Sequence, residues 1–198
     1  MADSTNNKPF EVEVRFSISD INAFKQIVAD LGCELIKEYS FIDYYYKPVL
    51  GNWDSLEKTI RIRDWRQANK PAVIYITKQE IKTEANFTFK KSMYLEGKTP
   101  LFSGDSDQCR EILEDLGFKQ VYSIDKKQGY VWENSAHDLE FCAEETDAFG
   151  WTGEMEIEGT NSEYIKDRIE RHKKYLQLQD SQLSYKPMAV LLEEKLGR

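Results

Sequence analysis

The chain has 198 residues, with 27 Lys and Arg against 35 Asp and Glu, which gives a formal net charge of −8. Because binding to a nucleic-acid backbone depends on basic surfaces, this balance argues against a nucleic-acid partner. No run of about 18 apolar residues occurs and the N-terminus lacks the features of a signal peptide, so we expect a cytoplasmic protein with no membrane partner. The length predicts a single domain over residues 9–198, preceded by a polar, disordered segment at residues 1–8.

Hydrophobic periodicity predicts an α+β fold in which antiparallel sheet dominates. Helical spacing of apolar residues predicts four helices, at about residues 20–31, 106–116, 162–178 and 188–196. Alternation with a period of two predicts eight strands, at Phe10–Ile18, Glu38–Tyr46, Thr59–Trp65, Ala72–Ile81, Phe87–Glu96, Val121–Trp132, Asp138–Glu144 and Gly153–Glu158. Residues 28–46 and 113–132 also resemble each other, which predicts two similar halves that pair around a pseudo-two-fold axis.

Cysteine and histidine offer little chemistry in this chain. Cys33, Cys109 and Cys142 have no zinc-ligand spacing, and their odd number argues against a disulfide framework. His137 and His172 are isolated in the sequence, so neither a histidine-based metal site nor a Ser-His-Asp triad is supported, and we expect both at the surface.

The first predicted strand carries an unusual polar face. Because side chains alternate along an extended backbone, Glu11, Glu13 and Arg15 share one face while the valines between them share the other. The two carboxylates then stand about 7 Å apart, from a rise of roughly 3.3 Å per residue. Two such groups repel each other unless a positive charge lies between them, as a divalent cation would. The alternative is an ordinary solvated sheet face.

Other strands concentrate charge of one sign on one face. Glu154, Glu156 and Glu158 lie together on the last strand, and Arg61 and Arg63 on the third. Further cations on the middle strands are Lys78, Lys90, Lys126 and Lys127. If the sheet closes into a barrel, these faces point into one lumen with acidic and basic walls. A triphosphate bound with Mg²⁺ or Mn²⁺ matches such a lumen, because arginine binds its oxygens and hard cations bridge carboxylates to phosphate.

An ordered series of motifs spans about residues 10–193: Glu11-Val-Glu13-Val-Arg15, Asp43-Tyr44-Tyr45-Tyr46, Ile60-Arg61-Ile62-Arg63, Lys78, Leu116-Gly117-Phe118, Phe149-Gly150 followed by Gly153-Glu154-Met155-Glu156, and Ser184-Tyr185. The series resembles the CYTH superfamily, or triphosphate tunnel metalloenzymes, which includes class IV adenylyl cyclases and thiamine triphosphatases. The first motif departs from the family's Glu-x-Glu-x-Lys pattern, because Arg15 stands where lysine is usual. The resemblance implies an eight-stranded antiparallel β-barrel that forms a tunnel, with helices packed on its outside.

The resemblance also implies roles for the charged residues. Metal binding is implied for Glu11, Glu13, Glu145, Glu154, Glu156 and Glu158. For the ligand of the seventh strand, the spacing back from Phe149 favours Glu145, whereas strand alternation favours Glu144. Phosphate binding is implied for Arg15, Arg61, Arg63, Lys78, Lys90, Lys126 and Lys127. Of these two sets, Glu11, Glu13, Arg61, Arg63 and Lys78 are the expected catalytic residues.

The function implied is metal-dependent hydrolysis of a small molecule bearing a triphosphate, with Mg²⁺ or Mn²⁺ as cofactor. Tripolyphosphate, thiamine triphosphate and a nucleoside triphosphate are all candidate substrates. One alternative is a class IV adenylyl cyclase that converts ATP to cyclic AMP and pyrophosphate. Another is a non-catalytic module that binds polyphosphate or nucleotides. We also expect a homodimer.

Overall fold

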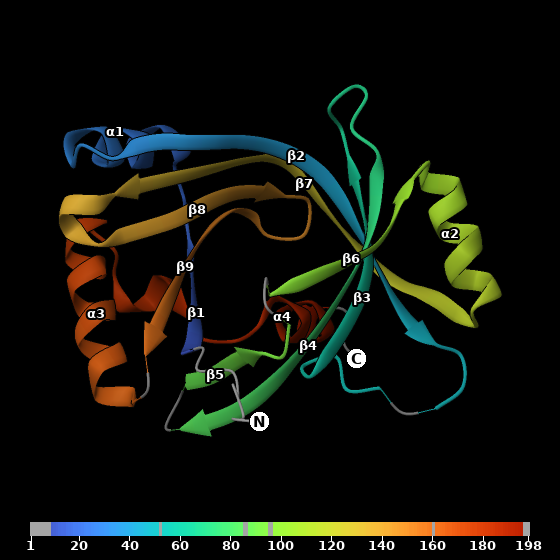
Figure 1. The fold of residues 1–198 in the computed structure, drawn as a ribbon. Coiled ribbons are helices and arrows are strands. Elements are labelled where there is room, and N and C mark those ends of the chain that lie inside the picture. The colour runs from blue at the N-terminus through green and yellow to red at the C-terminus, as the bar shows by residue number, and fades with distance from the viewer. Residues whose placement is uncertain (1–8, 52, 85–86, 95–96, 160, 196–198) are drawn as a thin grey trace, which may run out of the picture.

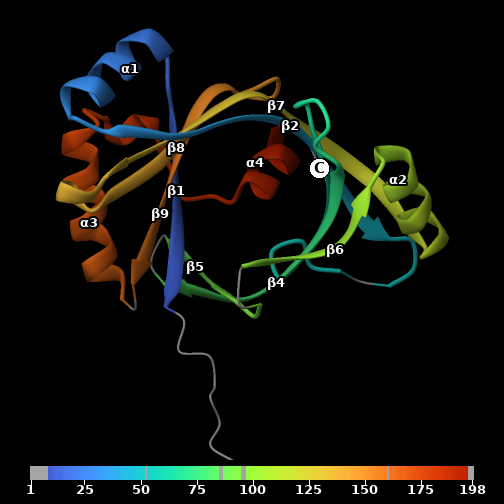
Figure 2. The same ribbon diagram turned by 45° about the horizontal axis from the view of Figure 1, so that its top comes forward.

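Eight antiparallel strands close into a ring in the computed structural model, which describes residues 9–51, 53–84, 87–94, 97–159 and 161–195. The order around the ring is β1-β5-β4-β3-β2-β7-β8-β9, and β9 pairs again with β1. The turned view of Figure 2 shows the strands arranged in a ring. This ring confirms the predicted α+β tunnel architecture, whereas the expected disordered segment at residues 1–8 lies outside the described residues.

The ring strands coincide with the eight strands predicted from the sequence. They are β1 (Phe10–Ser17), β2 (Glu34–Pro48), β3 (Lys58–Trp65), β4 (Ala72–Glu84), β5 (Phe87–Ser92), β7 (Phe118–Asn134), β8 (Leu139–Thr146) and β9 (Gly150–Gly159). Two further strands lie off the ring: β6 (Lys98–Gly104) pairs with β4, and β10 (Leu183–Ser184) pairs with β1. Neither was predicted. Strand β6 contains Pro100, and proline is confined to sheet edges because it cannot donate a ladder hydrogen bond.

Four helices complete the fold as predicted: α1 (Ile21–Asp30), α2 (Ser106–Asp115), α3 (Ser162–Tyr175) and α4 (Met188–Lys195). Two short 3₁₀ turns occur at Ser135–His137 and Asp180–Gln182. Helices α1 and α3 lie on one side of the ring and α2 on the other (Figure 1). Helix α4 differs from these three, because both views show it within the outline of the ring.

Two apolar cores hold α1, α2 and α3 against the outside of the ring. The larger core joins Phe24 of α1 and Ile165 of α3 to the outward apolar face of β1, where Val12 and Val14 are fully buried. The smaller core joins Leu113 of α2 to Ile62 and Ile74 of β3 and β4. Because alternate residues of each strand face these cores, their neighbours in the sequence must face the tunnel.

The two similar sequence segments fold as two similar units. Asp20 and Asp105 cap the starts of α1 and α2, each accepting a hydrogen bond from a backbone N–H of the first turn. Gly32 and Gly117 then end the helices with φ values of 74° and 80°, which glycine adopts without strain. The strands that follow, β2 and β7, pair with each other antiparallel along most of their length.

Candidate active site

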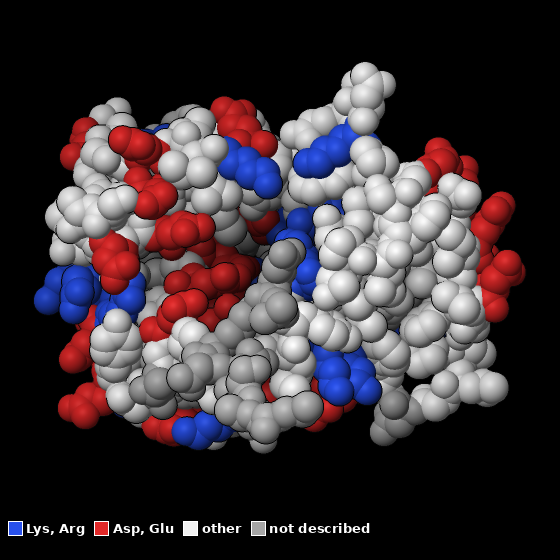
Figure 3. Space-filling view, viewed as in Figure 1, with Lys and Arg blue, Asp and Glu red and all other residues white. Residues whose placement is uncertain are grey.

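A cavity of about 1000 Å³ runs through the ring. Its charged lining includes Glu11, Glu13, Arg15, Asp43, Arg61, Arg63, Lys90, Lys98, Lys126, Glu144, Glu154, Glu156 and Glu158. Figure 3 shows this hollow from one side, with acidic side chains on one flank and basic side chains on the other. The topology explains the separation, because β9 and β3 are four strands apart in both directions around the eight-stranded ring and so lie on opposite sides.

The acidic wall is built by the pairing of β1 with β9. The register places Glu11 opposite Glu158 and Glu13 opposite Glu156. One carboxylate oxygen each from Glu13, Glu154 and Glu156 lie within 4.8 Å of one another. Burial and the neighbouring Glu154, Glu11 and Glu13 raise the pKa of Glu156 to about 8. This concentration of negative charge is chemically suited to a hard divalent cation, which takes carboxylate oxygens as ligands.

Two cations hold Glu13 in its ionised form. Burial alone would raise the pKa of Glu13, but Lys90 and Arg15 outweigh it and lower that pKa to about 2. The Lys90 Nζ lies 2.6 Å from one carboxylate oxygen, and Nη2 of Arg15 donates to the other at 3.1 Å. Arg15 also forms an ion pair with Glu154. The structure thus places Arg15 between two carboxylates of the acidic wall rather than beside the other arginines.

The basic wall is organised around one buried aspartate. Arg63 donates two hydrogen bonds to Asp43, at 2.8 Å and 2.7 Å, and Nε of Arg61 lies 3.5 Å from the same carboxylate. Asp43 is only 1% exposed, and although its burial favours the neutral acid, Arg61 and Arg63 lower its pKa. Nη1 of Arg61 donates a hydrogen bond to the Tyr45 hydroxyl at 3.3 Å, so this guanidinium is held by longer contacts than that of Arg63.

A third charged group lies on β7 and β8, between the two walls. Nζ of Lys126 lies 2.5 Å from Glu144, which also accepts a hydrogen bond from the Tyr39 hydroxyl. Burial opposes the charge on both partners, but their attraction prevails: the pKa of Glu144 is lowered and that of Lys126 is raised. Of the two glutamates left open by the sequence, the structure therefore brings Glu144 into the tunnel.

Three predicted site residues do not line the cavity. Glu145 points away because it alternates with Glu144 along β8, which corrects the placement inferred from the spacing to Phe149. Lys127 is exposed, at an irregularity in the pairing of β7 with β8 between Lys126 and Gln128. Lys78 is exposed as well. The register pairs Thr77 with the inward-facing Thr59, so the residue after Thr77 faces outward.

The sequence did not identify every charged residue of the tunnel. Asp43 was noted as part of a motif but not as the partner of the arginines. Strand alternation offered a signal, because it puts Asp43 on the same face as Tyr45, which lines the tunnel. Lys98 was missed because its strand was missed. His172, expected at the surface, is 2% exposed on α3 at the cavity margin.

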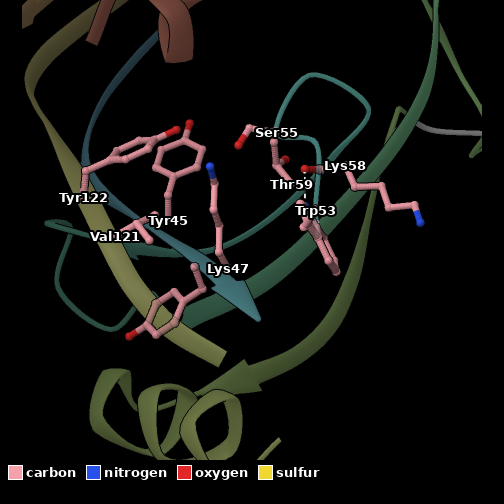
Figure 4. Close-up of a pocket in the computed structure, with 9 residues that line it drawn as sticks. Tyr45, Lys47, Trp53, Ser55, Lys58, Thr59, Val121 and Tyr122 are labelled. Atoms are coloured by element: carbon pink, nitrogen blue, oxygen red, sulfur yellow. Dashed lines mark hydrogen bonds between the residues drawn. The ribbon is translucent and has the colours of Figure 1, made fainter. Parts of the chain in front are cut away.

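A small pocket of about 10 Å³, enough for roughly one water molecule, shares part of its lining with the cavity. Figure 4 shows Tyr45 beside Tyr122, and their ring centroids are 4.8 Å apart. The Trp53 indole N–H donates to the Lys58 carbonyl at 2.5 Å and so anchors the loop that carries Ser55. The pocket is too small for a substrate, but Tyr45 and Tyr122 also line the main cavity.

A comparison with protein families identifies the family of this chain. The model of the CYTH domain matches residues 9–187. The chain belongs to the CYTH domain family. This CYTH domain has no significant sequence match among curated proteins. No helix in the described part of the chain is both long and apolar enough to cross a membrane.

Solved structures resemble this CYTH domain along nearly the whole chain. A conserved hypothetical protein from Pyrococcus furiosus is 22% identical, with a TM-score of 0.67 over 91% of this chain and 99% of that one. A putative adenylate cyclase from Vibrio parahaemolyticus is 16% identical, with a TM-score of 0.67 over 97% and 100%. A putative adenylyl cyclase from Hippeastrum, described as having a dominant triphosphatase activity, is 15% identical, with a TM-score of 0.61 over 96% of each chain. At these identities the likeness establishes the fold alone.

Proposed function

We propose that this CYTH domain protein is a divalent-metal-dependent hydrolase of a small molecule bearing a triphosphate, with Mg²⁺ or Mn²⁺ as the metal. One observation carries the proposal: the carboxylates of Glu13, Glu154 and Glu156 converge on one side of the tunnel, and Arg61 and Arg63 lie on the strand opposite. A ligand that fits both sides must be anionic and must also accept a bound cation. The cavity of about 1000 Å³ is of a size found in small-molecule sites.

The carboxylate cluster fits the proposed metal. Glu13, Glu154 and Glu156 would hold the ion, and Glu11 and Glu158 lie beside them on the same two strands. A divalent cation at such a site polarises phosphoryl oxygens and lowers the pKa of a bound water. Arg15 and Lys90 balance the charge of Glu13 in the absence of the ion, and we expect both to turn toward phosphate oxygens when the ion is present.

The arginines bind and orient the phosphate chain in this proposal. Arg63 is fixed by two hydrogen bonds to Asp43, so its guanidinium plane is set before the ligand arrives. Arg61 lines the same cavity and is held by longer contacts, to Asp43 and to the Tyr45 hydroxyl, so its guanidinium is free to turn toward a non-bridging phosphate oxygen. Hydrolysis adds water to the terminal phosphorus and breaks the anhydride P–O bond, releasing orthophosphate. Fixed cations stabilise the charge that develops during this transfer.

The test is to incubate the protein with Mg²⁺ or Mn²⁺ and, in separate reactions, with tripolyphosphate, thiamine triphosphate and ATP. Orthophosphate, pyrophosphate and cyclic AMP are then measured. We expect orthophosphate release that Glu11→Gln or Glu156→Gln abolishes and that Glu145→Gln, outside the tunnel, leaves within twofold. Metal-dependent activity retained in both tunnel variants would overturn the metal assignment.

Two other products of the same experiment would point to other functions. Cyclic AMP and pyrophosphate from ATP would identify an adenylyl cyclase, in which the ribose hydroxyl rather than water attacks. Thermal stabilisation by tripolyphosphate without turnover of any of the three compounds would identify a non-catalytic binding module. Either result would replace the proposed hydrolase.

A further inference from the structure

Strand β6, which is not one of the ring strands, places the side chain of Lys98 in the tunnel. It pairs with the first half of β4, and the register places Lys98 directly beside Thr77. Thr77 faces the tunnel, and Lys98 lines the same cavity. Its side chain is half-buried, with Nζ 5.5 Å from the centroid of the Tyr75 ring on β4.

Arg63 approaches the same aromatic ring. Its guanidinium carbon lies 6.0 Å from the Tyr75 centroid, so two cations from different strands share one aromatic neighbour. Burial, Arg63 and Arg61 together lower the pKa of Lys98 to about 8, against weaker opposing effects of Asp43 and Glu156. The lysine is therefore in a place where positive charge is already in excess.

Lys98 also differs in its partners from Lys90 and Lys126, two other lysines that line the tunnel. Lys90 is paired with Glu13 and Lys126 with Glu144, each at an ion-pair distance. Lys98, in contrast, forms no ion pair with any described residue: no carboxylate oxygen among them lies within 4.0 Å of its Nζ. Asp43, a carboxylate that acts on Lys98, is already engaged by Arg61 and Arg63. A cation held among arginines without an anion of its own favours an anionic ligand.

We propose that Lys98 completes a phosphate subsite with Arg61 and Arg63, and that it supplies the tunnel cation that the sequence motif assigned to Lys78. The inference rests on the proposed function only in taking a triphosphate as the ligand. The exposed side chain of Lys78 is on the outer face of β4, whereas β6 carries Lys98 around to the inner face beside Thr77. Both lysines belong to the same small sheet region, so they form a matched pair for substitution.

The test measures tripolyphosphate binding by calorimetry in EDTA at pH 7, where no metal and no turnover contribute. We expect Lys98→Met to weaken binding about tenfold, as loss of one charged phosphate contact does. Lys78→Met removes the same charge from the outer face and should bind within twofold of the unsubstituted protein. Equal affinity for the Lys98→Met and unsubstituted proteins, or a larger loss in Lys78→Met, would overturn the proposal.

A second variant separates ligand contact from a structural role. Lys98→Arg keeps its charge up to pH 9, whereas Lys98 loses its proton around pH 8 in the free protein. The affinity ratio of Lys98→Arg to the unsubstituted protein should therefore rise about threefold or more between pH 7 and pH 9. A constant ratio would contradict the subsite even if Lys98→Met failed to fold. No binding by the unsubstituted protein in EDTA would also overturn the subsite, whereas the proposed function is tested separately, by metal-dependent phosphate release.

Discussion

Glu13 and Glu156 are cross-strand partners on β1 and β9, yet their surroundings displace their pKa values in opposite directions. Lys90 and Arg15 overcome burial and lower the pKa of Glu13 to about 2. Burial and three neighbouring glutamates raise the pKa of Glu156 to about 8. The pair therefore combines one carboxylate that is ionised at neutral pH with one that ionises when a cation binds or the pH rises.

The raised pKa of Glu156 predicts how the metal-free protein responds to pH. The folded protein prefers the protonated acid, so stability is full below the ordinary value of 4.5 and is lost as the pH rises through about 8. Glu156→Gln removes this loss. In EDTA at pH 8.5, we expect the variant to have a higher melting temperature than the unsubstituted protein, measured by scanning fluorimetry.

Mn²⁺ should reverse the order of the two proteins in the same assay. The ion stabilises the unsubstituted protein because it binds the ionised cluster, and the stabilisation should grow from pH 6.5 to pH 8.5 as Glu156 loses its proton. Glu156→Gln should gain little at either pH. Equal Mn²⁺ stabilisation of both proteins would show that Glu156 is not a ligand.

Asp43→Asn should destabilise the protein by about 3 kcal/mol, because two arginines at the tunnel wall lose their buried counter-charge. Urea unfolding gives this free energy. Tripolyphosphate should restore part of the loss, since its oxygens supply the missing negative charge. An unfolding free energy unchanged by the substitution would contradict the central place given to Asp43.

Glu144→Gln and Glu145→Gln should differ sharply, although they change adjacent residues in the same way. Glu144→Gln leaves the partner Lys126 without its counter-charge in the tunnel, and we expect a destabilisation of about 2 kcal/mol. Glu145→Gln should remain within about 0.5 kcal/mol of the unsubstituted protein, as is usual away from buried networks. Urea unfolding of both variants checks the register of β8, and the reverse order of effects would reject it.

His172 should limit stability in mild acid. Its side chain is 2% exposed, and both ring nitrogens lack a hydrogen-bond partner among the described residues. Burial and Arg168 lower its pKa to about 4 from 6.5, so stability is full above 6.5 and falls as the pH drops toward 4. A shift of this size corresponds to about 3 kcal/mol.

Unfolding free energies at pH 7 and pH 4.5 test this prediction. His172→Leu should remove the part of the pH dependence that comes from the histidine. His137→Leu is the matched control substitution, at a half-buried histidine whose ring centroid lies 4.4 Å from that of Tyr175. If the unsubstituted protein and His172→Leu lose stability equally, the buried histidine does not titrate.

Alternation along single strands predicted much of the tunnel. The face shared by Glu11 and Glu13, and the one shared by Arg61 and Arg63, follow from the period of two, because the apolar residues between them must be buried. The eight ring strands were all predicted for the same reason. Alternation failed where the sheet is irregular. One such place is the shift in the pairing of β7 with β8 after Lys126, and the other is β6, which was not predicted as a strand because it contains Pro100.

The sequence by itself therefore determined the fold, the sign of charge on each strand face and the family, since these depend on local periodicity and on motifs read in order. The tertiary structure alone decided which residue of each neighbouring pair enters the tunnel. It selected Glu144 over Glu145 and Lys126 over Lys127, and it placed Lys98 rather than Lys78 beside the arginines. The physical reason is register: a shift of one residue sends a side chain to the opposite face, and register is set by pairing between strands far apart in the chain.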